Sequence, residues 1–344
     1  MNLELARKVA DAVLYEGYML YPYRPSALKN RQRWSFGILY PPAYPEVTLG
    51  TERSTMHSEC LLQTQTDADA SIHIQLRFLH LLSRQYMQAA DGRSEPVPSL
   101  LIDGELFESW DEPIERRVDF PVANLFVGQQ HHFTFPAIMQ LESMLDRNDK
   151  LAGRVTNTQA EVTGTISITT QKLGNYLLKL TIDVANTTPM PWQAPAHDIE
   201  RNTALLSSLL SAHTILTATN AEFVSMLDPP AESQESAALC RNLGNFPVLV
   251  GTEPERDMML CSPIVLYDYP QIAPESASNF YDATEMDEML TLRVLTLTDA
   301  EKNEMSHTNE HVRNLLQRTE QNARAQLTRT HGTIRGMRSV EERP

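Results

Sequence analysis

The sequence predicts an α+β protein with a β-rich, sandwich-like N-terminal half and a helix-rich C-terminal half. Apolar and polar residues alternate through 71–82 and 160–188, the pattern of strands with one buried face. Leucines recur at helical spacing from residue 205 to residue 216. Prolines at 189–195 interrupt the chain between these regions. We therefore expect a β-rich domain with an N-terminal helix at 1–190, an α+β region at 197–330 and a mobile tail at 331–344.

The elements of the N-terminal half follow from local patterns. Residues 3–14 place apolar side chains near one helix face, and residues 162–184 alternate as a β-hairpin does. Phe133, Phe135 and Ile138 look like packing residues of a strand. Further strands are expected at 34–40, 58–64, 71–82 and 100–102.

The C-terminal half is predicted to contain three helices, with short strands between the first and the second. A helix is expected to begin at Asp198 or Asn202 and to carry His213 on its apolar face. Short strands are expected within 245–251 and 258–269. A second helix is expected after Asp282 or Thr284, and a polar third helix after Thr298 or Asp299, because these residues are suitable N-caps.

Composition limits the classes of partner. The chain has 344 residues, with 29 Lys and Arg against 44 Asp and Glu, which gives a formal charge of −15. Phosphate binding needs clustered cations, so nucleic acid and anionic membrane surfaces are not expected partners. A basic protein surface is compatible with this charge, and oligomerisation stays open.

Cysteine usage and hydropathy predict the cytoplasm. The three cysteines are far apart in sequence and odd in number, which is typical of a reducing compartment. The N-terminal residues lack the apolar core of a signal peptide, and no run approaches the ~18 apolar residues of a membrane span. We expect no direct membrane span.

Residues 21–40 form the best candidate for a partner-binding surface, because aromatic residues and arginine dominate interface hot spots. The alternative is that the aromatic side chains belong to the core and the cations to a solvated rim. The candidate residues of this stretch are Tyr21, Tyr23, Arg24, Arg31, Arg33 and Trp34.

Metal and catalytic sites have weaker support. Asp282 and Glu285 could bind a hard cation, but carboxylates at a helix start are already explained by capping. His57 and Cys60 would point to opposite faces of a strand, and no second ligand pair has that spacing. His213 is expected to be a core histidine, because no nucleophile elbow accompanies it. We expect no cofactor and assign no catalytic residue.

Several stretches together resemble a known family. The most specific are SPIVLYDYPQIAPES at 262–276 and FYDATEMDEMLTLRVLTLTDAEK at 280–302. The chain resembles an uncharacterised accessory protein family encoded in uptake nickel–iron hydrogenase gene clusters of the actinobacterial type, and the resemblance covers residues 3–302. It implies an accessory, scaffolding or assembly role, with hydrogenase subunits or other products of the same cluster as partners. The alternative is a metal-dependent hydrolase or maturation enzyme that uses His57, Cys60, His213 or the carboxylates of 282–288.

Overall fold

The computed structural model describes residues 3–24, 27, 30, 33–44, 48, 50–64, 70–90, 93–174, 176–189, 200–272, 281, 287–308 and 310–330. Contacts divide the chain into two compact units. Unit 1 contains Met1–Tyr18 and Gln32–Gln271, and unit 2 contains Met19–Arg31 and Ile272–Pro344. Strands dominate unit 1, and three of the helices follow one another near the C-terminus, so the chain is an α+β protein.

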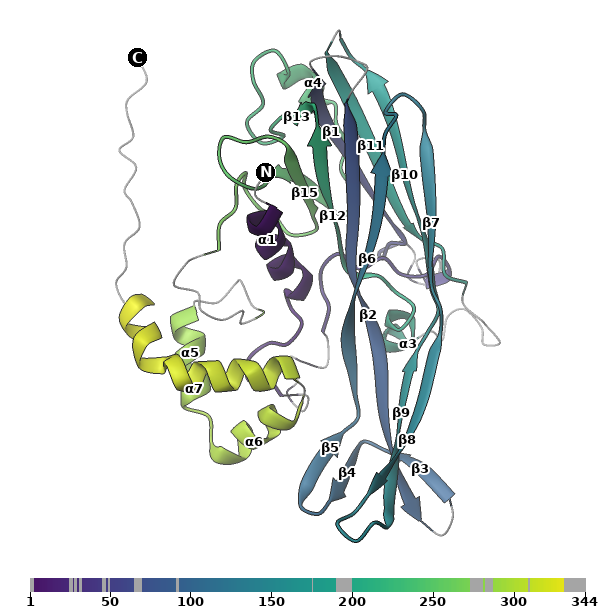
Figure 1. Ribbon diagram of the computed structural model, residues 1–344, viewed down its shortest axis with the longest axis vertical. Coiled ribbons are helices and arrows are strands. Elements are labelled where there is room, and N and C mark those ends of the chain that lie inside the picture. Colours follow the sequence, from purple (N-terminus) through teal and green to yellow (C-terminus); the bar gives the residue numbers. More distant parts are fainter. Residues whose placement is uncertain are drawn as a thin grey trace. The chain divides into compact units, whose positions relative to one another are not determined.

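Unit 1 contains two large antiparallel sheets (Figure 1). The first has the strand order β13-β1-β11-β10-β7. Its strands are β1 (Thr55–Thr64), β7 (Gln129–Phe135), β10 (Val162–Lys172), β11 (Leu177–Asn186) and β13 (Ala221–Phe223). The predicted hairpin of 162–184 is confirmed, since β10 and β11 pair from Gly164↔Asn186 to Lys172↔Leu178.

The second sheet is organised on β2 (Ser71–Ala90), a strand of 20 residues. Its main path is β14-β15-β12-β2-β9-β8, and β3 and β6 also pair with β2. The partners of β2 are β3 (Arg93–Val97), β6 (Trp110–Val122), β9 (Leu151–Gln159) and β12 (Leu210–Thr219). The remaining strands are β8 (Ile138–Leu145), β14 (Phe246–Leu249) and β15 (Met258–Ser262).

The main core lies between these two sheets. Alternate residues of β2 such as Ile74 and Phe78 meet Leu180 and Ile182 of β11 in one apolar cluster. The side-chain period of two places these residues on one face of each strand. Helix α1 (Leu3–Tyr15) packs Val9 and Val13 on the second sheet in a separate cluster.

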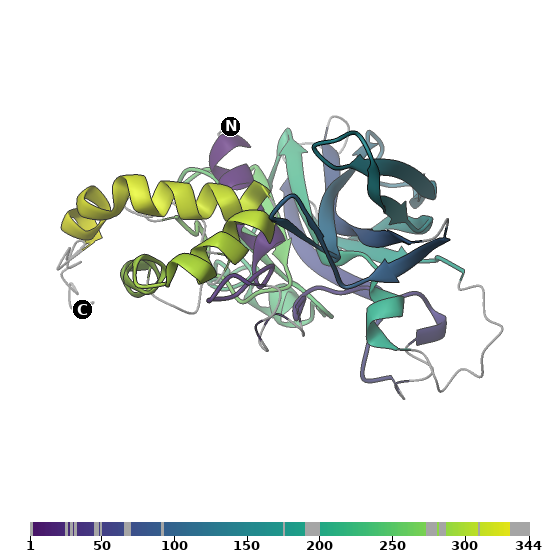
Figure 2. The same ribbon diagram turned by 90° about the horizontal axis from the view of Figure 1, so that it is seen from below.

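A small lobe extends the second sheet beyond the main core. We call it the distal lobe: residues 83–90 of β2, strands β3, β8 and β9, and the hairpin of β4 (Ser99–Ile102) and β5 (Glu105–Glu108). Its own core contains Tyr86, Leu100, Ile102 and Val155. In Figure 1 this end carries the labels β3, β4 and β5, and Figure 2 views the protein from this end.

In the distal lobe, the β4–β5 hairpin covers the face of β2 that the first sheet covers in the main core. Phe78 in the main core and Tyr86 in the lobe are eight residues apart on one continuous strand, so they share a face. Gly153 of β9 makes the close packing possible, because a Cβ there would lie 2.7 Å from the carbonyl oxygen of Met87 and collide with Leu100. The lobe is therefore a specifically packed structure with its own small core.

Three sequence expectations about elements are wrong. Residues 34–40, expected as a strand, form only an isolated bridge between Leu39 and Leu209. Residues 210–219 form strand β12, and the only helix of 201–209 is the five-residue α3 (Arg201–Leu205). Strand β12 is buried on both faces between β2 and β15, so its apolar run lacks the alternation that identifies a strand. The helix of residues 3–14 was expected to place its apolar side chains near one face, but Leu5 is exposed.

The chain divides elsewhere than at the predicted boundary of 189–196. Strands on both sides of that segment share a sheet, since β2 pairs with β12 from Ser71↔Thr219 to Leu79↔Leu210. Helix α4 (Gln234–Ala238) also contacts β1 of the N-terminal half. The tail at 331–344 lies outside the described residues.

Unit 2 contains helices α5 (Asp287–Leu295), α6 (Asp299–Thr308) and α7 (Glu310–Thr330), with α7 in contact with both others. The predicted start of α6 is confirmed. The backbone N–H of Glu301 donates to the Thr298 hydroxyl, and the Glu301 carboxylate accepts from the backbone N–H of Thr298, which is a capping box. No helix of the described residues is long and apolar enough to span a membrane.

Candidate functional site

The predicted partner-binding residues of unit 2 are largely engaged within that unit. Tyr23 is fully buried. Arg24 forms ion pairs with Glu301 and Glu304 of α6, at 3.1 and 3.3 Å. Tyr21 lies 5.5 Å below the guanidinium of Arg293. Arg31 lies outside the described residues.

The two predicted residues of unit 1 pack against other aromatic rings. Trp34 is buried and stacks on Tyr18 at 5.4 Å between ring centroids. The Arg33 guanidinium lies 3.5 Å from the ring centroid of Trp110 and donates to the carbonyl oxygen of Asp111. Burial lowers the pKa of Arg33 to about 10. Tyr23 and Trp34 are therefore core residues, and Arg24 and Arg33 hold segments of the fold together.

His57 and Cys60 point to opposite faces of β1. His57 meets Asp183 of β11, with 2.6 Å between Nδ1 and Oδ1, whereas Cys60 is buried in the main core. Burial raises the pKa of the Cys60 thiol well above its ordinary value, so this thiol is unreactive. Among the described residues, no three His, Cys, Asp or Glu side chains converge to hold a metal ion. Asp282 and Glu285 lie outside that part of the chain.

Glu59 anchors a loop on the outer face of the first sheet. Its carboxylate accepts from Lys179 Nζ at 2.8 Å and from the backbone N–H of Arg241 at 2.7 Å. Burial acts to raise the pKa of Glu59, but these two hydrogen bonds outweigh it and hold the pKa below the ordinary value. The carboxylate is therefore charged and fully engaged, which suits a structural role.

His213 is a core residue, as expected, but it lies on strand β12. Its Nδ1 is 2.8 Å from the carbonyl oxygen of Ser211, and Nε2 has no hydrogen-bond partner. Burial lowers the pKa of His213 to about 3, so the imidazole is neutral. With Nδ1 engaged to backbone and Nε2 unpartnered, the geometry gives no nucleophile–base pair.

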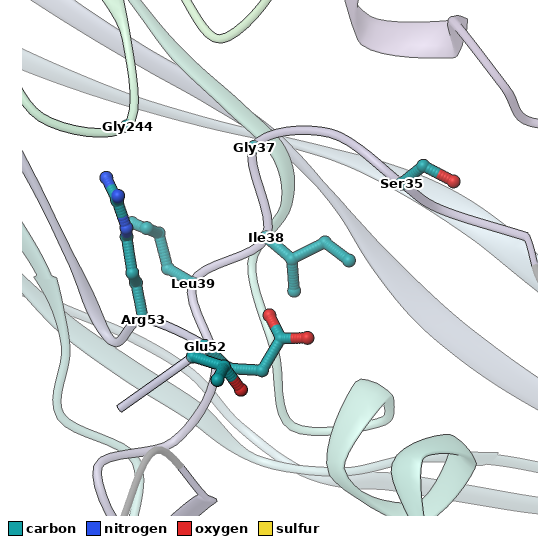
Figure 3. A pocket seen from close by; sticks show the side chains of 8 residues that line it. Ser35, Gly37, Ile38, Leu39, Glu52, Arg53 and Gly244 are labelled. Atoms are coloured by element: carbon teal, nitrogen blue, oxygen red, sulfur yellow. The ribbon is translucent and has the colours of Figure 1, made fainter. Parts of the chain in front are cut away.

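A pocket of about 180 Å³ opens beside the segment that precedes β1 (Figure 3). Glu52 and Arg53 supply its charged groups, and Gly37 and Gly244 form parts of its wall. Figure 3 shows the Arg53 guanidinium directed toward Gly244 and the Glu52 carboxylate directed toward Ile38. The two groups do not converge on one point, and the pocket is smaller than the ~300 Å³ at which ligand sites usually begin.

The distal lobe presents a different kind of surface. Leu101 and Leu106 are directly opposite each other in the β4–β5 hairpin and are 68% and 40% exposed. Their neighbours Leu100, Ile102 and Phe107 point the other way, into or against the lobe core. The hairpin thus has one anchored face and one apolar face in solvent, which we call the leucine face: Ser99, Leu101, Leu106 and Glu108.

The turn of this hairpin is fixed to the rest of the lobe. Asp103 accepts from the backbone N–H of Arg147 at 2.6 Å and from its Nε at 3.0 Å. Arg147 lies in the turn between β8 and β9, so the two turns are tied together. A tied hairpin loses little conformational entropy when it binds a partner, because it is already ordered.

Strand β8 is the second exposed apolar feature of the lobe. Met139 and Leu141 are 75% and 57% exposed, and Leu145 on the same face is also exposed. Ile138, which the sequence suggested as a packing residue, is exposed as well. Met144 packs against the lobe core and so marks the inner face of the strand.

The sequence did not predict this surface, because the exposure of its residues depends on which strand lies at the edge of the sheet, and local sequence patterns do not show that. Exposed apolar side chains become informative when they gather in one region, as they do here. No family model, curated protein or solved structure matches the chain. The case for a function therefore rests on the geometry of the lobe and on the sequence resemblance.

Proposed function

We propose that the protein is a non-catalytic accessory protein that binds a partner polypeptide through the leucine face of the β4–β5 hairpin. From the sequence resemblance, we propose that the partner is a subunit of a nickel–iron hydrogenase or another product of the same gene cluster. The observation that carries the docking surface is the cross-strand pair of Leu101 and Leu106, exposed on a hairpin whose opposite face is anchored.

The chemistry of this face favours an apolar partner surface with a basic rim. Two adjacent leucines offer apolar area whose burial contributes roughly 25 cal/mol per Å². Glu108 lies beside Leu106 on the same face, and Glu105 flanks the hairpin turn. The whole chain carries a charge of −15, which adds long-range attraction toward a cationic partner.

We further propose that the protein acts in the cytoplasm as an assembly or scaffolding component. The three cysteines are free thiols, and Cys60 and Cys261 are buried, which supports a reducing compartment. Engagement of His57, Glu59 and His213 in the fold supports a binding role over the metal-dependent enzyme that the sequence left as an alternative.

Co-purification tests this proposal. The double variant Leu101→Asp with Leu106→Asp should lower the amount of hydrogenase subunits recovered with the tagged protein at least about tenfold, because it places two charges in the apolar contact. Quantitative mass spectrometry of the named subunits gives the readout.

Leu239→Asp is the matched control. Leu239 is 71% exposed and lies outside the lobe, so this variant should recover the subunits as the wild type does. If no hydrogenase subunit is recovered with the wild-type protein under gentle conditions, the hydrogenase part of the proposal is overturned. If the double variant binds as well as the wild type, the leucine face is not the docking surface.

A further inference from the structure

The four strands that end the main paths of the two large sheets differ in how their edges are protected. In the part of the chain that the structure describes, strands β3 and β6 also pair only with β2, but both contain proline and charged residues. Strand β13 has three residues, and the backbone N–H of Phe223 donates to the carbonyl oxygen of Arg256. Strand β14 contains Pro247, and Leu249 is capped by the Asp268 carboxylate and by the backbone N–H of Tyr269. Both edges are short and covered, which is how soluble proteins avoid edge-to-edge pairing.

The other two edges are longer and contrast with each other. The exposed residues of β7 are polar: Gln130, His132 and Thr134. Strand β8 is exposed at seven of its eight positions, contains no proline and no lysine, and carries one charge, Glu142. Among the described residues no strand pairs with the outer edge of β8, so its backbone donors and acceptors face solvent. It is the least protected edge of the two large sheets among the described residues.

We propose that the outer edge of β8 pairs with β8 of a second copy of this chain. A two-fold axis perpendicular to the sheet places the two strands antiparallel and extends the second sheet across both copies. Each copy would then satisfy the backbone groups of the other. The inference goes beyond the proposed function and does not depend on it, because the leucine face lies on the hairpin and not on β8.

Face and charge select one register for this pairing. A two-fold axis perpendicular to the sheet keeps each face of β8 on the same side in both copies. Opposed residues then have side chains on the same face, so their two residue numbers must add to an even number. Two such registers pair seven of the eight residues: one centred on Leu141 and one centred on Glu142. The second places two Glu142 carboxylates directly opposite each other, which is destabilising.

The register centred on Leu141 is complementary instead. Leu141 faces its own copy, and Met139 reaches the same pair diagonally, so the exposed apolar side chains of both copies gather on one face. On the other face, Gln140 lies opposite Glu142 of the second copy, where an amide can donate to the carboxylate. The two Glu142 carboxylates become diagonal neighbours, about 7–8 Å apart, so they repel each other less than in the register that places them directly opposite. The apolar self-complementarity and the pairing of Gln140 with Glu142 are the grounds for choosing a second copy as the occupant.

The extent of the contact sets its strength. Stable interfaces bury about 800 Å² per partner, and a single pair of eight-residue strands falls short of this. The net charge of −15 on each copy opposes association further at low salt. We expect a reversible dimer with a dissociation constant between about 10 µM and 1 mM, strengthened by salt.

Single cysteines test the register. In a Cys240→Ser background, Leu141→Cys should form an intermolecular disulfide on mild oxidation, because opposed residues have Cα atoms about 4.5–5.5 Å apart. Met139→Cys and Ser143→Cys should not cross-link alone, since each would lie about 14 Å from its own copy at about 3.4 Å per residue. A mixture of the last two variants should cross-link, because those positions face each other.

Sedimentation velocity completes the test. The wild type should show a concentration-dependent dimer that Leu141→Lys abolishes, with an unchanged circular dichroism spectrum. A wild type that stays monomeric to about 1 mM, or equal cross-linking at 139, 141 and 143, overturns the inference. Loss of hydrogenase recovery in Leu141→Lys without any dimer also overturns it and assigns β8 to the partner. Loss of recovery in the leucine-face variant alone concerns the proposed function and leaves the dimer intact.

Discussion

The main body and the distal lobe of unit 1 share strand β2 but differ in how they are stabilised. In the body, two sheets enclose a core that includes residues such as Phe78 and Phe223 with no exposed surface. In the lobe, four buried residues hold the hairpin against the end of β2 and strands β3, β8 and β9, and apolar side chains remain in solvent. The body also has exposed apolar residues, such as Leu239 and Val265. In the lobe, the exposed apolar residues lie on neighbouring strands of a small structure, where they form a surface available for binding.

Truncation of one core residue in each region should give the largest effect and the clearest contrast. Phe223→Ala should lower the free energy of unfolding of unit 1 by about 3–5 kcal/mol, because it leaves a cavity in the main core. Leu100→Ala should instead open the lobe locally, with loss of amide protection in β4, β5 and β9 and a smaller change in global unfolding.

Urea denaturation and hydrogen exchange read these two outcomes separately. Equal losses of global stability in both variants would mean that the lobe and the body unfold as one cooperative unit. Met139→Ala is the control in the lobe, because Met139 is exposed and its truncation leaves no cavity.

Low pH should also affect the body and the lobe differently. The change in the free energy of unfolding per pH unit should be smaller than the change caused by the core truncations. The body contains two buried histidines, whereas the segments of the lobe contain none. Burial, with the neighbouring Arg116, lowers the pKa of His80 to about 4, and burial lowers that of His213 to about 3. Below about pH 6.5 these histidines bind protons in the unfolded chain but stay neutral in the folded chain.

The free energy of unfolding should therefore fall as the pH drops from about 6.5 toward the folded pKa values, by up to about 1.4 kcal/mol per pH unit for each histidine. His213→Leu should flatten this slope, because it removes one group of the pair. His132→Gln on the exposed part of β7 should leave the slope unchanged. An unchanged slope in His213→Leu would show that His213 does not resist protonation in the fold.

Local sequence patterns predicted the elements whose two faces differ. The β10–β11 hairpin and the first part of β2 alternate clearly, and Thr298 with Glu301 marks the start of α6. Strand β12 was mistaken for a helix because it is buried on both faces, and its leucines fit either period. The strand pairing that unites residues on both sides of 189–196 is long-range, and no local pattern reports it.

The candidate site was harder to predict, because exposure is a property of the tertiary structure. Tyr23 and Trp34 have the composition of an interface hot spot, yet the fold buries them. Met139 and Leu141 have the composition of a core, yet they lie on an edge strand and are exposed. Composition identifies residues whose burial is favourable. The surrounding elements of the tertiary structure determine whether such a residue is buried within the chain or is left exposed for a partner.

The tie between the two turns of the lobe should give the smallest effect. The Arg147 side chain is 74% exposed, so removal of its ion pair with Asp103 in Arg147→Gln should cost less than about 1 kcal/mol and should vanish at high salt. Asp103→Ala should cost more, because it also removes the acceptor for the backbone N–H of Arg147. Both effects should appear as faster hydrogen exchange in the β4–β5 hairpin, with exchange in β1 and β11 unchanged. If Arg147→Gln instead speeds exchange in the body, the lobe is coupled to the main core more tightly than its four buried residues imply.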